Sequence, residues 1–99
     1  MIRGTTPTFI FNLPFDVSNI KSAYITIKSR GTEVEKAVTD CSLNGTTITV
    51  KLTQEETLAL PESQIAGVQL RVLTNDNDAL ASDVFPIKVE EILKEGVIE

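Results

Sequence analysis

The side chains of this sequence that could do covalent chemistry are few and far apart. Cys41 is the only cysteine, and the chain has no histidine that could act as its base. A thiol becomes a good nucleophile when positive charge or a base lies beside it, but the neighbours of Cys41 are Asp40 and Ser42. We therefore interpret Cys41 as a small core-facing residue. A single cysteine also excludes a disulfide within the chain.

Three short acidic clusters are the next candidates, for acid–base catalysis or metal binding. The glutamate pairs at positions 55–56 and 90–91 are adjacent in sequence, and adjacent side chains on a strand point to opposite faces. The cluster at positions 75–78 offers oxygen ligands for calcium. Counted from its first aspartate, however, the sixth and twelfth positions are Ala81 and Ile87, where an EF-hand loop has glycine and glutamate. We predict surface carboxylates and a plain turn, with no catalytic, cofactor or metal site.

Composition narrows the classes of partner. The 99 residues carry 14 acidic and 9 basic side chains, a net charge of −5 that repels nucleic acid. The apolar stretches are much shorter than the roughly 20 residues that span a bilayer, and the first residues do not resemble a signal peptide. The sequence predicts one domain over residues 1–99, made in the cytosol, with neither a nucleic-acid nor a membrane partner.

Alternation of apolar and polar residues is the clearest structural signal. It predicts strands over residues 8–13, 22–28, 66–73 and 79–89. A more polar run over residues 33–39 is predicted to lie at a sheet edge, where charge discourages unwanted pairing. Pro86 cannot donate a hydrogen bond to a neighbouring strand, so its half of the last strand is also predicted at an edge or a bulge.

The Asn-Gly pair at positions 44–45 predicts a type I′ hairpin, whose two-residue loop would place Cys41 opposite Ile48. Continued backwards, this register would turn the glutamates of the run at 33–39 inward and its valines outward. We therefore expect a bulge or break near Thr39 and Asp40.

A short helical turn is predicted after Thr53, because Thr53 and Glu56 have the spacing of a capping box and Pro61 ends the segment. Six to seven short strands with this single helical turn predict an all-β fold, an antiparallel β-sandwich of immunoglobulin-like type. A small open or closed barrel is the alternative.

Several apolar residues fall on strand faces opposite the presumed core. They are candidates for an interaction surface with another subunit or a copy of the chain, and they are Ile10, Tyr24, Leu73 and Leu80, joined by Val97 and Ile98 of the tail. A second layer of core at the sheet ends is the other interpretation. The tail itself, residues 90–99, is either an extension of the domain or an apolar strip for a partner.

Five segments carry a resemblance to a known group of proteins. They are residues 1–9, Leu13-Pro14-Phe15-Asp16, Leu52-Thr53-Gln54-Glu55, residues 69–74 and Leu80-Ala81-Ser82-Asp83. Together they resemble a family of short proteins encoded among the structural genes of tailed bacteriophages and prophages of Firmicutes. The resemblance covers roughly residues 1–90. It implies a virion-associated or tail-region protein, made in the host bacterial cytoplasm, without catalytic residues.

These observations lead to one main expectation and two alternatives. We expect a non-enzymatic phage structural protein that assembles with other phage proteins or with itself in the tail, the baseplate or the capsid surface, without a cofactor. The first alternative is a module that binds carbohydrate or another host-surface ligand, with Tyr24 as its aromatic platform. The second is a small acidic regulator that inhibits a host protein.

Overall fold

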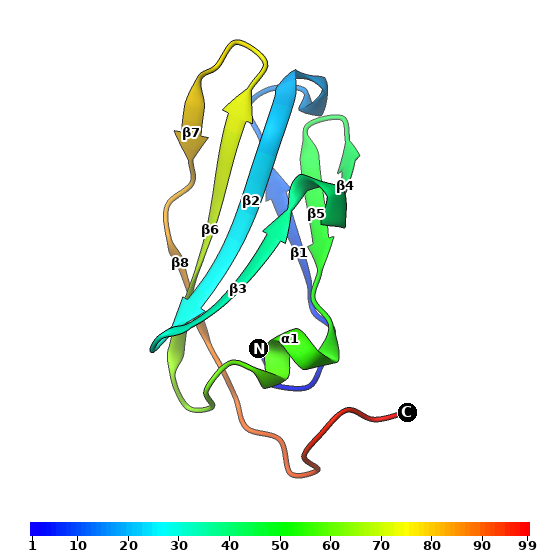
Figure 1. The fold of residues 1–99 in the computed structure, drawn as a ribbon, viewed down its shortest axis with the longest axis vertical. Coiled ribbons are helices and arrows are strands. Elements are labelled where there is room, and N and C mark those ends of the chain that lie inside the picture. Colours follow the sequence, from blue (N-terminus) through cyan, green and yellow to red (C-terminus); the bar gives the residue numbers. More distant parts are fainter.

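The computed structural model of the protein describes residues 1–99 as two antiparallel sheets packed face to face (Figure 1). The strands are β1 (Thr8–Asn12), β2 (Ile20–Ser29), β3 (Thr32–Ala37), β4 (Cys41–Asn44), β5 (Thr47–Lys51), β6 (Ile65–Thr74), β7 (Ala79–Ala81) and β8 (Phe85–Lys88). One α-helix, α1 (Gln54–Leu58), and two 3-10 helices, η1 (Val17–Asn19) and η2 (Val38–Asp40), join them. The predicted all-β sandwich with one short helical turn is confirmed.

The strand order shows which elements lie at the edges. The small sheet has the order β1-β5-β4. The large sheet has the order β3-β2-β6, and β7 and β8 pair one after the other with the far side of β6. In an immunoglobulin domain the second strand belongs to the sheet of the first, fourth and fifth strands. Here β2 lies between β3 and β6 instead, so the immunoglobulin strand order is not confirmed.

The core lies between the two sheets, where alternate residues of the central strands face inward. Ile25 and Ile27 of β2 are fully buried, and they face Ile48 of the small sheet across the core cluster. Each such side chain contributes about 1.5–3 kcal/mol through removal of apolar area from water. The residues of β2 that alternate with them, such as Tyr24 and Lys28, point to the other face of the sheet and are exposed. The period of two that predicted these strands is therefore the period of burial.

The β4–β5 hairpin differs from its predicted register. Its loop starts one residue later than predicted, at Gly45, and Cys41 lies opposite Val50 instead of Ile48. Gly45 has a φ of 60° at the first central position of the loop, the arrangement of a type II′ turn and not of the predicted type I′. Because the register differs by two residues, Cys41 still lies on the face that points to the core.

The predicted break before this hairpin is confirmed. The 3-10 helix η2 interrupts the chain at Val38–Asp40, where the Asp40 carboxylate accepts a hydrogen bond of 2.9 Å from the Ala37 amide. This break lets Val34 of β3 turn inward, while Glu35 remains exposed. β3 forms an edge of the large sheet, as its polar composition predicted.

Helix α1 covers one end of the sandwich. The predicted capping box is confirmed: the Thr53 hydroxyl accepts from the Glu56 amide (3.1 Å), and the Glu56 carboxylate accepts from the Thr53 amide (2.8 Å). Lys36 of β3 donates to the same carboxylate at 3.0 Å and so attaches α1 to the large sheet. None of the helices has the length and apolar composition needed to cross a membrane.

The segment before β1 is attached at the same end. The Arg3 guanidinium donates to the carbonyl of Leu58 (2.8 Å), at the end of α1, and to that of Leu60 (2.9 Å), just after it. The Arg3 amide also donates to the carbonyl of Glu90. These bonds attach the segment before β1 to α1 and to the segment after β8.

Candidate docking groove between two sheet edges

The two sheets do not cover each other completely. On the side of β7 and β8 the large sheet extends beyond β1, the outermost strand of the small sheet (Figure 1). The inner faces of β6, β7 and β8 consequently have no strand opposite them along this side. The result is a groove of about 720 Å³ that lies between β1 on one wall and β7 and β8 on the other.

This space, which we call the edge groove, is lined almost entirely by apolar side chains. Its principal lining residues are Phe9, Phe11, Leu13 and Phe15 from β1 and the following loop, Leu70 from β6, and Leu80, Phe85 and Ile87 from β7 and β8. All four phenylalanines of the chain belong to this lining. Aromatic side chains provide large apolar contact areas, so the groove gathers the strongest apolar binding groups of the molecule.

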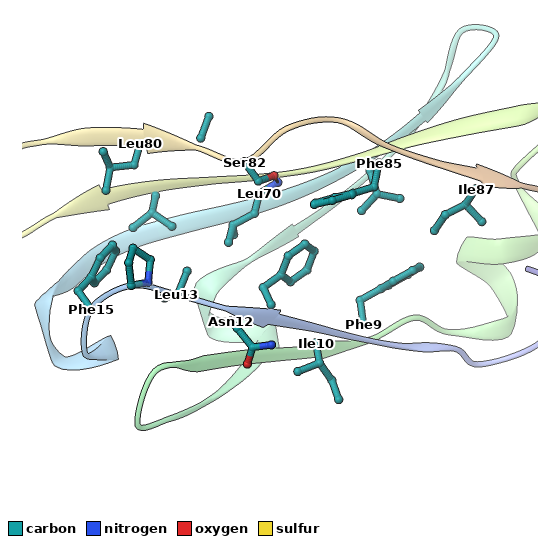
Figure 2. A pocket seen from close by; sticks show the side chains of 15 residues that line it. Phe9, Ile10, Asn12, Leu13, Phe15, Leu70, Leu80, Ser82, Phe85 and Ile87 are labelled. Atoms are coloured by element: carbon teal, nitrogen blue, oxygen red, sulfur yellow. Dashed lines mark hydrogen bonds between the residues drawn. The ribbon is translucent and has the colours of Figure 1, made fainter.

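The walls face each other across open space. Figure 2 shows Leu80, Phe85 and Ile87 on one side, and Phe9, Leu13 and Phe15 directed toward them from the other. Phe85 remains 50% exposed and Leu80 45% exposed, although both lie on the inner face of their sheet. Their neighbours on β6, Val68 and Val72, are buried. The exposure therefore arises from the missing cover over the outer strands.

One wall of the groove is an unpaired strand edge. The Leu52 amide donates to the Pro7 carbonyl, and the Leu13 amide donates to the Thr46 carbonyl. Main-chain groups alternate in direction along an antiparallel strand, so the amides and carbonyls of Phe9 and Phe11 also face β5. The amides and carbonyls of the alternate residues Thr8, Ile10 and Asn12 point in the other direction, to the open side, where no strand pairs with β1.

The opposite wall is interrupted between β7 and β8. At the break, the Ser82 amide donates to the Leu70 carbonyl (2.8 Å), and the Ser82 hydroxyl accepts from the Leu70 amide (3.0 Å). The side-chain amide of Gln69 donates to the Ser82 carbonyl (3.0 Å). Ser82 thus holds the break against β6, and the edge bends there without leaving β6.

The electrostatic character of the edge groove is neutral. No charged residue contributes to its lining, and its polar residues are Asn12 and Ser82. Transfer of a charge into such a site is costly unless a partner charge is present. The groove is therefore suited to bind an uncharged apolar group by burial, with hydrogen bonds available along the β1 edge.

The residues predicted as one interaction surface occupy separate places. Tyr24 and Leu73 lie on the outer face of the large sheet, on neighbouring strands. Ile10 is 63% exposed, and its side chain points away from the edge groove (Figure 2). Val97 and Ile98 lie in the tail beside α1, where the Gln54 side chain hydrogen-bonds the main chain of Ile98 in both directions.

Leu80 is the one residue of that predicted set whose side chain lies in the groove, and its predicted orientation is corrected. A continuous strand over residues 79–89 would place Leu80 on the face opposite Phe85. The break at residues 82–84 changes the phase, so Leu80 pairs with Val72 on the inner face. The same break divides one predicted strand into two, which is why eight strands are found where six to seven were expected.

The other candidates for chemistry stay apart from the groove. Burial, reinforced by the nearby Asp40, raises the pKa of the Cys41 thiol, against a smaller opposite effect of Lys36. The thiol donates to the Ala37 carbonyl at 3.3 Å. No group of three histidine, cysteine or acidic side chains is arranged to hold a metal ion.

The sequence reasoning missed Phe85, Phe9, Phe11 and Leu13 as site residues because their phase assigned them to one face of a strand with the presumed core, and it missed Phe15 because it lay in a predicted loop. A usable signal was present: three phenylalanines lie within residues 9–15, and the fourth precedes Pro86, whose half of the last strand was predicted at an edge or a bulge. No protein-family model, curated protein or solved structure matches the chain.

Proposed function

We propose that this protein is a non-enzymatic assembly module that docks a partner protein in the edge groove. The observation that carries the proposal is the open apolar groove of about 720 Å³, in which Phe85 and Leu80 remain about half exposed. Exposed apolar surface of this kind is typical of interaction sites, and covering each of these two side chains would contribute about 1–2 kcal/mol.

The context that we propose is a bacteriophage or prophage virion. Its support is the resemblance of residues 1–90 to small proteins encoded among phage structural genes. In such a particle the domain would join its neighbours through a rigid sheet edge, without a cofactor. The net charge of −5 is compatible with protein partners and unfavourable for nucleic acid.

The test compares two substitutions of similar exposure on opposite faces of the large sheet. Phe85→Asp places a charge in the edge groove, and Ile65→Asp places the same charge on the outer face, where Ile65 is 61% exposed. Each variant is introduced into the phage or induced prophage that carries the gene. The abundance of the protein in purified virions is then measured by quantitative mass spectrometry.

We expect wild type and Ile65→Asp to be present in virions at equal abundance, and Phe85→Asp to be reduced about tenfold or more, since a buried unpaired charge costs several kcal/mol. Circular dichroism of the purified variants verifies that both are folded. Equal incorporation of folded Phe85→Asp would refute docking in the groove. Absence of the wild-type protein from virions would refute the proposed context.

A further inference from the structure

We infer that the occupant of the edge groove is an extended segment of the partner that pairs with β1 as an additional antiparallel strand and inserts uncharged apolar side chains at alternate positions. This inference rests on the proposed docking function and specifies the partner's chemistry. The added strand would widen the small sheet from three strands to four, and it would lie opposite the part of β6, β7 and β8 that the small sheet leaves uncovered.

The main chain of β1 supplies the first argument. Thr8, Ile10 and Asn12 direct their amides and carbonyls to the open side, which provides a row of donors and acceptors at the spacing of a β-strand. A compact apolar ligand could fill the space but could not satisfy this row. An extended peptide does both, because its main chain pairs with this row while its alternate side chains point to one face and fill the space.

The side chains supply the second argument. Phe9 and Phe11 lie on the inner face of β1, so inserted side chains of an added strand would be their cross-strand neighbours. From the other layer, Phe85 and Leu80 would contact the same inserted groups (Figure 2). Because no charged residue lines the groove, the inserted side chains must be uncharged.

The chain's own C-terminal tail does not have this chemistry. In an extended conformation Leu93 and Val97 share a face, but Glu95 lies between them. The opposite face carries Lys94. Either face would bring a charge into the neutral groove, so the pattern favours a different protein over the tail of a second copy.

A second copy pairing through its own β1 is disfavoured by shape. Antiparallel pairing of two identical edges places both large sheets on the same side of the joined small sheets. Since each large sheet extends beyond β1 on that side, the β7–β8 edges of the two copies would occupy the same space. A single strand fits beneath the overhang, whereas a second whole sandwich does not.

The experiment uses the full chain and a synthetic peptide of about nine residues, enough to span β1 at about 3.4 Å per residue. The peptide alternates threonine and valine, carries a lysine at each end and has blocked termini. In the control peptide the threonine amides, which would face β1 in antiparallel pairing, are N-methylated, so its side chains remain but its pairing donors are lost. Binding is followed by NMR of isotope-labelled protein.

We expect the first peptide to bind with a Kd below about 1 mM and to slow amide hydrogen exchange at Thr8, Ile10 and Asn12 about tenfold. The N-methylated peptide should bind about tenfold more weakly, and Phe85→Asp should weaken the first peptide similarly. Absence of binding up to about 1 mM would overturn the inference. Equal binding of both peptides in the groove would also overturn it, but would leave docking in the groove intact.

The oligomeric state of the free protein tests whether a second copy of the chain occupies the groove instead. We expect the free protein to sediment as a monomer. A dimer that Phe85→Asp dissociates and Ile65→Asp does not would identify a second copy as the occupant and overturn the inference. Failure of the docking function itself is read separately, from undiminished incorporation of Phe85→Asp in virions.

Discussion

Truncation of Phe85 to alanine measures how open the edge groove is in solution. Phe85 is 50% exposed, so about half of its apolar area is in contact with water in the folded protein. Replacement of a fully buried phenylalanine by alanine costs about 3–5 kcal/mol. With half of the area already exposed and no enclosed cavity created, we expect the free energy of unfolding to fall by about 2 kcal/mol.

The assay is urea denaturation followed by circular dichroism. A small domain has an unfolding free energy of about 5–15 kcal/mol, so the variant remains folded, and its midpoint falls by about 1–2 M urea. The control is Leu70→Ala on β6, whose side chain is only 3% exposed and whose loss should cost about 3–5 kcal/mol. If Phe85→Ala is as costly as Leu70→Ala, the groove is closed in solution and the reasoning is refuted.

Three further substitutions or titrations test the local chemistry. Arg30 has a φ of 45° in the β2–β3 turn, so Arg30→Asn should stabilise the protein by about 0.5–1 kcal/mol; an unchanged melting temperature would contradict this. Thr53→Ala removes the cap of α1 and should cost about 1 kcal/mol in urea denaturation, whereas a neutral result would show that the cap is dispensable. Because burial raises the Cys41 pKa and the thiolate is the reactive form, alkylation by iodoacetamide should accelerate at a more alkaline pH than for free cysteine; coincident profiles would contradict the burial.

The features that the sequence predicted correctly depend on neighbouring residues. The capping box of Thr53 and Glu56 requires only the first turn of a helix. The edge position of Pro86 follows from its missing amide hydrogen. The break near Asp40 was predicted because one uninterrupted strand would have turned the glutamates of residues 33–39 inward and the valines outward. In the structure the 3-10 helix η2 forms this break.

The features that were missed depend on the arrangement of whole strands. Alternation identifies β2 as half-buried but does not say which sheet it joins, and β2 pairs with β3 and β6 instead of β1. The hairpin loop was placed one residue early because an Asn-Gly pair also fits a turn in which glycine alone has a positive φ. The orientation of Leu80 depended on a break that is fixed by Ser82 across the sheet.

The edge groove could not have been derived from any one segment. Phe9, Phe11 and Phe85 have the phase of core residues, and Phe9 and Phe11 do pack against the core cluster. Their remaining exposure arises because the small sheet ends at β1 while the large sheet continues through β7 and β8. The width of each sheet is a property of long-range pairing, which local periodicity does not encode.

Site-specific photo-cross-linking within virions tests the central claim most directly. A benzoylphenylalanine at position 85 reports what covers the edge groove, and the same group at position 65 reports the outer face of the large sheet. We predict that irradiation links position 85 to one partner protein and leaves position 65 without a specific adduct. An adduct from position 65 with none from position 85 would contradict docking in the groove.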